Sequence, residues 1–159
     1  MSTADHVTPV APEAPVPPPG RRVVIAVDDT PAARTTLASG LAHAAAQDAE
    51  AVVVHVVPAR AWRVARMAPC HTVPLRARDP QASPVLREAR RLAFGNGVRA
   101  RVELIASDDP DAVVAGVARR EGADSIVVGV RRPEALAAPF GGVRGLLRAA
   151  GVPVVVVPA

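Results

Sequence analysis

The chain has 159 residues and a formal net charge of +4; half of its residues are hydrophobic, yet only 2% are aromatic. This length suits one domain, whose core must be built from aliphatic side chains. A single cysteine excludes a disulfide framework and a cysteine-based zinc site, and because all 19 basic residues are arginine, lysine chemistry such as Schiff-base formation is excluded as well.

The first 20 residues hold six prolines and show no apolar periodicity. This composition predicts a disordered, proline-rich tail over residues 1–20, which is either solvated or a ligand for a partner domain. Residues 21–159 are then expected to form the folded domain. No apolar run approaches the roughly 18 residues that a membrane span needs, so we expect a cytoplasmic protein that does not contact membranes.

Beyond the tail, short β-branched runs alternate with segments of helical character. The runs are almost continuously apolar, which is typical of strands that are covered on both faces. Their order predicts a single doubly wound α/β domain with a five-stranded, mainly parallel sheet and helices on both faces. In chain order the segments are strand 22–27, helix 31–47, strand 51–57, helix 84–94, strand 98–106, helix 110–121, strand 125–129, helix 143–150 and strand 153–157.

Three of the helix starts carry the same signal. Thr30-Pro31, Ser83-Pro84 and Asp109-Pro110 each place an N-cap residue before a proline at the first helical position. One connection, residues 58–82, is longer than usual, which predicts either a functional flap or a partly disordered segment.

The position of a ligand site follows from the predicted topology. In an open parallel sheet, ligands bind beyond the carboxyl ends of the strands, where the strand order reverses. We expect this reversal between the first and the fourth strand. Asp28 and Gly129 leave these strands, so the candidate site lies there, whereas Asp29 and Thr30 are interpreted as a turn and a helix cap.

The same residues resemble a known family. Residues 23–33, Val-Val-Ile-Ala-Val-Asp-Asp-Thr-Pro-Ala-Ala, and residues 51–57, Ala-Val-Val-Val-His-Val-Val, resemble the first two strands of universal stress proteins. Ser107-Asp-Asp-Pro110, Ile126-Val-Val-Gly129 and the final residues 147–157 also fit that family, in the right order. The resemblance implies a doubly wound fold, a regulatory role in stress response, usually a homodimer, and in many members an ATP site.

The glycine motif after the fourth strand departs from the family pattern. ATP-binding members carry Gly-x2-Gly-x9-Gly-Ser/Thr there. In this chain Gly129 matches the first glycine and Arg132 stands at the second, while the closing hydroxyl is missing whether Gly142-Val143 or Phe140-Gly141 is aligned with the end of the motif. The resemblance therefore implies weak or vestigial ATP binding.

By the same resemblance, the acidic residue after the first strand contacts the nucleoside, and the strand ends line an adenine pocket. Two glycines before the predicted helix 143–150 are in a position to offer backbone amides to a phosphate. The alternative is that these residues form only core strand ends and a glycine turn beside solvated arginines. The candidate cofactor-binding residues are Ala26, Asp28, Val56, Val128, Gly129, Gly141 and Gly142.

Other chemistry finds little support. No Ser-His-Asp arrangement or carboxylate pair is legible, so we expect no catalytic activity. His55 lies in an apolar strand and is interpreted as a core histidine with a backbone partner, and the adjacent Cys70-His71 would make a poor metal chelate. The arginines are spread out and stacking aromatics are nearly absent, which argues against a nucleic-acid partner.

Two functions remain open. The first is a dimeric regulatory module of the universal stress protein type with weak or vestigial ATP binding. The alternative is a nucleotide-independent protein-interaction module of the same fold. For either function, the apolar residues 154–157 predict a homodimer through the last strand, since an apolar edge strand pairs readily with a copy of itself.

Overall fold

Five parallel strands form one sheet in the order β3-β2-β1-β4-β5, so the strand order reverses between β1 and β4 as predicted. The computed structural model describes residues 20–59, 83–130 and 143–158; the predicted proline-rich tail and most of the 58–82 connection lie outside these ranges. The strands are β1 (Arg22–Val27), β2 (Glu50–Val57), β3 (Ala100–Ala106), β4 (Ser125–Val130) and β5 (Val154–Pro158).

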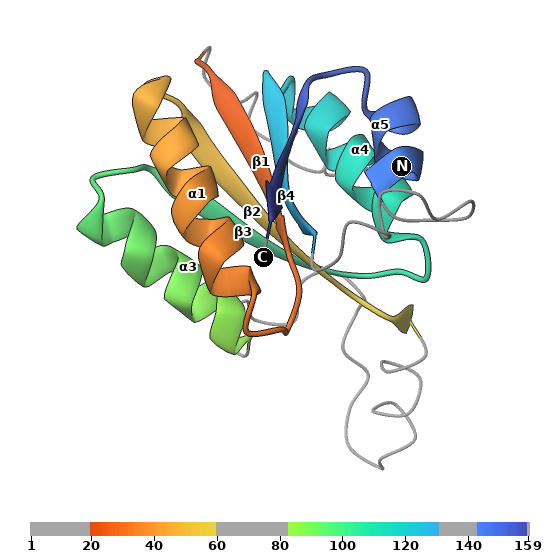
Figure 1. Cartoon of the computed structure of the whole chain (residues 1–159), viewed down its shortest axis with the longest axis horizontal. Coiled ribbons are helices and arrows are strands. Elements are labelled where there is room, and N and C mark those ends of the chain that lie inside the picture. Colours follow the sequence, from red (N-terminus) through yellow and green to blue (C-terminus); the bar gives the residue numbers. More distant parts are fainter. Residues whose placement is uncertain (1–19, 60–82, 131–142, 159) are drawn as a thin grey trace, which may run out of the picture.

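Helices cover both faces of the sheet, which confirms the predicted doubly wound α/β fold. Helices α1 and α3 lie on one face, and α4 and α5 lie on the other (Figure 1). None of the helices in the described ranges is long and apolar enough to cross a membrane. The helices are α1 (Ala33–Ala46), α3 (Pro84–Gly95), α4 (Pro110–Glu121) and α5 (Val143–Ala150).

The apolar strand runs arise because the sheet separates two core layers. Successive side chains of a strand point to opposite faces. Ile25 is fully buried against α1, whereas Val24 is fully buried in the layer beneath α4 and α5. Helix α1 approaches β1 closely at Gly40, where a Cβ would lie 2.8 Å from Cδ1 of Ile25. The continuous hydrophobicity of residues 23–27 is therefore required by burial on both sides.

The helix starts agree with the sequence in two cases and differ in one. Ser83 accepts a hydrogen bond from Leu86 N at 3.3 Å, and Asp109 accepts one from Ala112 N at 3.0 Å, so both are N-caps as predicted. The prediction that Thr30 caps the first helix is wrong. Helix α1 begins later, after Ala32, which makes no side-chain cap bond. Thr30 is instead held in the preceding turn, because its amide and hydroxyl both donate to Asp28.

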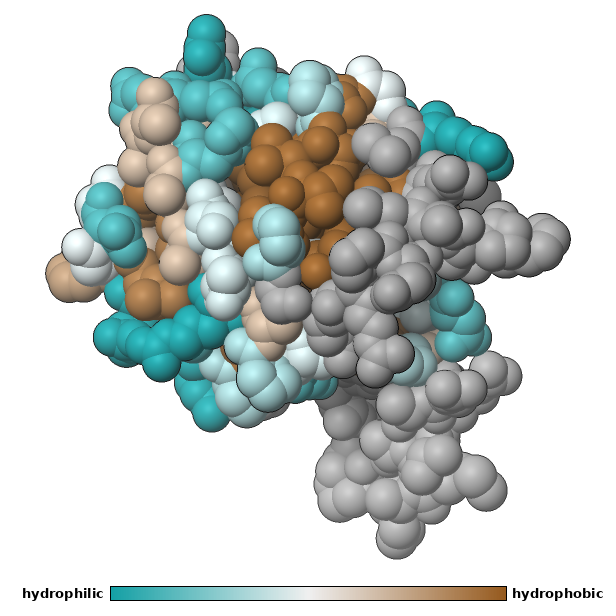
Figure 2. Space-filling view, in the orientation of Figure 1, coloured by the Kyte–Doolittle hydropathy of each residue, from teal (hydrophilic) through white to brown (hydrophobic). Residues whose placement is uncertain are grey.

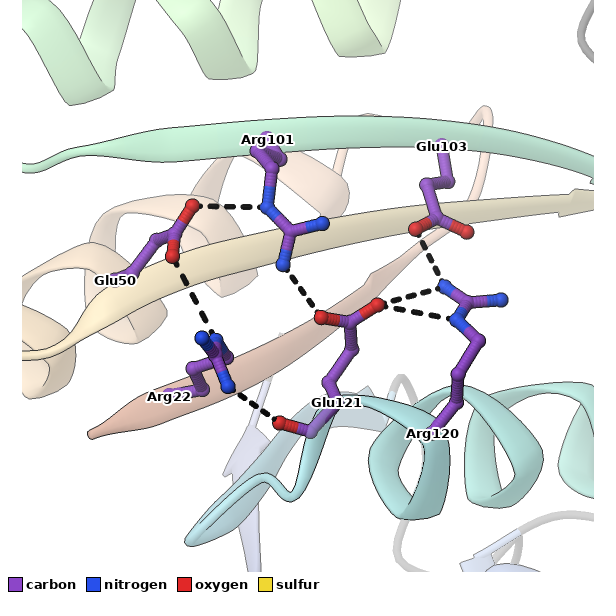
Figure 3. Close-up of polar contacts among 6 residues, drawn as sticks. All are labelled: Arg22, Glu50, Arg101, Glu103, Arg120 and Glu121. Carbon is purple, nitrogen blue, oxygen red and sulfur yellow. Dashed lines mark hydrogen bonds and ion pairs between the residues drawn. The ribbon is translucent and has the colours of Figure 1, made fainter. Parts of the chain in front are cut away.

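At the amino ends of the strands, arginines and glutamates alternate in one network (Figure 3). The Glu121 carboxylate accepts hydrogen bonds from Arg101 and Arg120, and its backbone oxygen accepts one from Arg22 at 2.8 Å. This network connects β1, β2 and β3 with the end of α4. It lies on the side of the sheet where the strands begin, away from their carboxyl ends. Its members are Arg22, Glu50, Arg101, Glu103, Arg120 and Glu121.

Candidate functional site

A cavity of about 250 Å³ lies at the carboxyl ends of β1 and β4, at the point where the strand order reverses. Its described walls come from the carboxyl-terminal parts of β1, β2 and β4, the turn after β1, the starts of α1 and α4, and one side chain of α5. The described lining residues are Ala26, Val27, Asp28, Thr30, Ala32, Ala33, Thr36, Val54, Val56, Pro110, Asp111, Val114, Val128, Gly129 and Leu146.

Five of the candidate residues meet at this cavity: Ala26, Asp28, Val56, Val128 and Gly129. They come from three neighbouring strands, which bring together positions up to about a hundred residues apart in sequence. The two remaining candidates, Gly141 and Gly142, lie outside the described residues, as does Arg132. The strand ends therefore serve as both core and cavity wall, so the two sequence interpretations of these apolar residues do not exclude each other.

One wall of the cavity is apolar. Ala26, Val56 and Val128 are half-buried and belong to the layer beneath α4 and α5. Val114 and Leu146 are buried and add to the same wall from the helices. An aliphatic wall of this kind is suited to a flat, weakly polar group such as a nucleobase, which gains from leaving water.

Asp28 places a carboxylate at the mouth of the cavity. Its Oδ1 accepts hydrogen bonds from the amide of Thr30 at 3.1 Å and from the Thr30 hydroxyl at 2.5 Å. The turn holds the exposed side chain of Asp28 in one direction. An oriented carboxylate at such a mouth can accept hydrogen bonds from the hydroxyls of a sugar.

Gly129 of β4 has no side chain, and Thr36 of α1 occupies the space beside it. A Cβ at Gly129 would overlap the hydroxyl of Thr36, which is buried and donates to the backbone oxygen of Ala32 at 3.4 Å. Both residues line the cavity. Gly129 thus fits its neighbour on α1 as well as the glycine motif that the sequence suggested.

Several cavity residues were not found from the sequence. Thr36, Pro110, Asp111 and Leu146 lie on helices, and nothing in their local pattern distinguishes them from ordinary helical residues. Asp111 stands in the first turn of α4, where an acidic residue already favours the helix dipole. Only the general rule that helix starts in this fold lie near the strand carboxyl ends could have drawn attention to it.

A polar cluster around His55 lies on the opposite face of β2 from Val54 and Val56, which line the cavity. The Nδ1 atom of buried His55 is 3.2 Å from the Ser83 hydroxyl, and its Nε2 atom is 3.4 Å from the Asp29 carboxylate. The expectation of a backbone partner for His55 is therefore wrong, because β2 ends opposite the cap of α3 and brings side chains to both ring nitrogens. Burial lowers the pKa of His55, although Asp29 and Asp28 act in the opposite direction. Through these two contacts, the His55 ring joins the turn after β1 to the start of α3.

No group of three or more histidine, cysteine, aspartate or glutamate side chains within the described ranges could hold a metal ion. A parallel, doubly wound sheet with such a cavity at its reversal point defines an α/β protein of the kind that binds ligands at the topological switch point.

Residues 20–158 match the model of the universal stress protein family, and the chain belongs to that family. Among the curated proteins, no match was found. A solved structure of a universal stress protein family member from Burkholderia pseudomallei is 26% identical, with 87% of this chain and 96% of that chain covered and a TM-score of 0.55.

Two further solved structures are described as nucleotide complexes. A universal stress protein in complex with cAMP is 16% identical, with 87% of this chain and 97% of that chain covered and a TM-score of 0.63. A universal stress protein from Archaeoglobus fulgidus in complex with dAMP is 21% identical, with 86% and 96% covered and a TM-score of 0.59. At 16% and 21% identity, these similarities show that the two proteins share the fold of this chain.

Proposed function

We propose that the chain is a regulatory module of the stress response whose switch-point cavity binds an adenine nucleotide, with weak affinity for ATP. The observation that carries the proposal is the convergence of Ala26, Val56 and Val128 with the oriented carboxylate of Asp28 at one cavity. The apolar wall would hold the base and Asp28 the sugar. Two proteins of the same fold, described in complex with cAMP and dAMP, support this choice of ligand.

The expected low affinity for ATP follows from the sequence of the loop after β4. Arg132 stands where nucleotide-binding relatives carry the second glycine, and the closing hydroxyl is missing. Glycine at such a position lets the backbone approach a phosphate closely, which a larger residue obstructs. The Gly141 and Gly142 amides remain the candidate phosphate donors. We assign no catalytic step and no nucleic-acid partner to the protein, and we place it in the cytoplasm.

The test is a calorimetric titration of the purified full-length protein with ATP and AMP. We expect a dissociation constant for ATP that is roughly millimolar, and Asp28→Asn should weaken AMP binding while the turn persists, because the amide oxygen can still accept from Thr30. Asp48→Asn is the matched control. Asp48 is exposed and lies just before β2, on the side of the sheet away from the cavity, and its positive φ of 50° suits asparagine.

Three results would contradict the proposal. The absence of binding by any adenine nucleotide would refute the site and favour the nucleotide-independent module. Equal affinities in the wild type and in Asp28→Asn would remove the role given to this carboxylate. A micromolar constant for ATP would refute the claim of weak binding.

We also propose that the protein is a homodimer that pairs through β5. Among the described strands, β5 pairs only with β4 and therefore forms a sheet edge. Val154, Val155 and Val156 are only half-buried there. Figure 2 shows an apolar area in the middle of this face, where β5 lies in Figure 1. This edge also supports the alternative function, since it offers an interaction surface that needs no nucleotide.

A further inference from the structure

We propose that Asn96 and Gly97 form a site of spontaneous deamidation, at which the end of α3 acquires a negative charge as the protein ages. Asn96 is the only asparagine of the chain, and a glycine follows it directly. The two residues form the exposed turn between α3 and β3 (Figure 1). This turn lies on the side of the sheet where β2 and β3 begin, away from the cavity, so the site is independent of the proposed adenine site.

The reaction needs no partner other than water. The backbone nitrogen of Gly97 attacks Cγ, the side-chain carbonyl carbon of Asn96, and a cyclic succinimide forms. The bond between Cγ and Nδ2 breaks, and the former amide group leaves as ammonia with the proton of the attacking nitrogen. Water then adds to either carbonyl of the ring and opens it, which yields aspartate or isoaspartate at position 96.

The glycine makes this position reactive. It has no Cβ that would hinder the attack of its nitrogen. Gly97 has a φ of +65°, in the left-handed region that favours glycine, so the turn itself requires this residue. The surroundings are open: within the described part of the chain, a Cβ at Gly95 or at Gly97 would meet nothing within 4 Å, and Phe94 is 89% exposed. The fold thus keeps a reactive pair accessible to water.

The folded turn slows the reaction without preventing it. Nδ2 of Asn96 donates a hydrogen bond to the backbone oxygen of Leu92 at 2.7 Å, and the attacking nitrogen of Gly97 donates one to that of Phe94 at 3.1 Å. The ψ angle of Asn96 is 5°, which turns the Gly97 nitrogen away from the Asn96 side chain. Both hydrogen bonds must therefore break before the attack. Helix ends open locally more readily than core elements do, so the rate of deamidation follows the opening of this last turn of α3.

The product loses the cap that Asn96 gives to α3. An aspartate side chain has no N–H group that could donate to the Leu92 oxygen. It also places a negative charge at the negative end of the helix dipole, and the last turn of α3 holds no basic residue. Isoaspartate lengthens the backbone by one carbon as well. Val98, which is buried and donates its amide to the backbone oxygen of Ala93 at 3.0 Å, would then be displaced.

The experiment incubates the full-length protein at pH 7 and pH 9, folded and in urea, and then digests it with trypsin. Cleavage after Arg91 and Arg99 releases the turn in one peptide. Mass spectrometry measures the exchange of the amide for a carboxylic acid, and labelling with an isoaspartate-specific methyltransferase measures the isoaspartate. A sample digested without incubation gives the background. Asn96→Gln is the matched control, because it keeps the amide but would have to form a larger ring, which closes slowly.

The folded wild type should be converted at position 96, and faster at pH 9 than at pH 7, because the attacking nitrogen must lose its proton. Conversion should be about tenfold slower than in urea, which corresponds to about 1.4 kcal/mol for opening the turn. Asn96→Gln should stay unmodified over the same period. The converted protein, separated by ion exchange, should unfold at a lower urea concentration than fresh protein, and Asn96→Asp should shift in the same direction.

Three results would overturn the inference. If Asn96 stays intact in the folded protein while the chain in urea is converted, the turn protects it and the site does not exist in the native state. If Asn96→Gln gains the same charge as the wild type, the modified residue lies elsewhere in the chain. If converted and fresh protein unfold at the same urea concentration, the modification does not act on the cap of α3.

Discussion

Thr36 and Gly129 fit against each other across the α1–β4 contact, because the threonine hydroxyl occupies the space that a side chain at position 129 would need. Both residues line the switch-point cavity, and Thr36 is almost fully buried. The glycine that the sequence associated with a phosphate loop is therefore also required by packing.

Replacing Gly129 with alanine should destabilise the fold by about 1–3 kcal/mol, the usual range for overpacking a core. The measurement is urea unfolding of Gly129→Ala, Thr36→Ala and the double variant. Removing the hydroxyl makes room, so the double variant should recover part of the loss. Strict additivity of the two single effects would show that the residues do not interact.

Glu121 should contribute a pH-dependent share of the stability. Burial opposes its ionisation, but hydrogen bonds and charges from Arg101 and Arg120 outweigh burial and lower its pKa (Figure 3). Because the folded-state pKa is below the unfolded value, the stabilisation is present at neutral pH and is lost as the pH falls below about 4.3 toward the folded-state value.

The variant Glu121→Gln should therefore lose about 1.5–3 kcal/mol at pH 7, the scale of a charged hydrogen bond. The difference from the wild type should shrink as unfolding is measured at decreasing pH from 7 to 3. Glu88→Gln is the control: it removes a half-buried carboxylate whose partners, Arg34 and Arg91, are exposed, so the loss should be much smaller than for Glu121→Gln. A difference for Glu121→Gln that stays constant with pH would contradict this account.

His55 should produce a separate pH effect in a higher range. Burial lowers its pKa in the folded state, so the unfolded chain binds the proton first. Stability should be constant above the unfolded-state value of about 6.5 and should fall as the pH decreases from there toward the folded-state pKa. Unfolding of the wild type and His55→Gln at pH 7 and pH 5 tests this, and an equal loss of stability in both proteins would contradict it.

The proposed dimer depends on the exposed edge of β5. Val156 is half-buried and belongs to neither core layer, so Val156→Lys should leave the fold intact and place a charge at the interface. Light scattering should then shift toward the monomer mass. Ala149→Lys adds the same charge to an exposed position of α5 and should remain dimeric. A wild-type protein that is monomeric at high concentration would refute the proposal.

The sequence predicted the fold well because its signals are local. Burial on both faces requires the apolar runs, and proline after serine or aspartate marks the starts of α3 and α4. The cap at Thr30 was missed because Asp28, two residues earlier, takes both donors of that threonine. That competition depends on the direction of one side chain at the end of β1, which no local pattern reveals.

The sequence located part of the candidate site. Strand ends at a switch point follow from topology, so Ala26, Asp28 and Gly129 could be placed together before the structure. Thr36 and Asp111 could not, because their positions depend on how α1 and α4 pack on the sheet. Their local sequence gives each an ordinary helical role, and only the tertiary arrangement turns them toward the cavity.

The most direct test of the central claim is to fill the cavity and measure binding. Val56→Phe places a larger side chain on the apolar wall, and its unfolding should be compared with the wild type to confirm that the fold persists. Titration with adenosine should show saturable binding to the wild type and none to the folded variant. Binding of equal affinity to both proteins would contradict the assignment of this cavity as the adenine site.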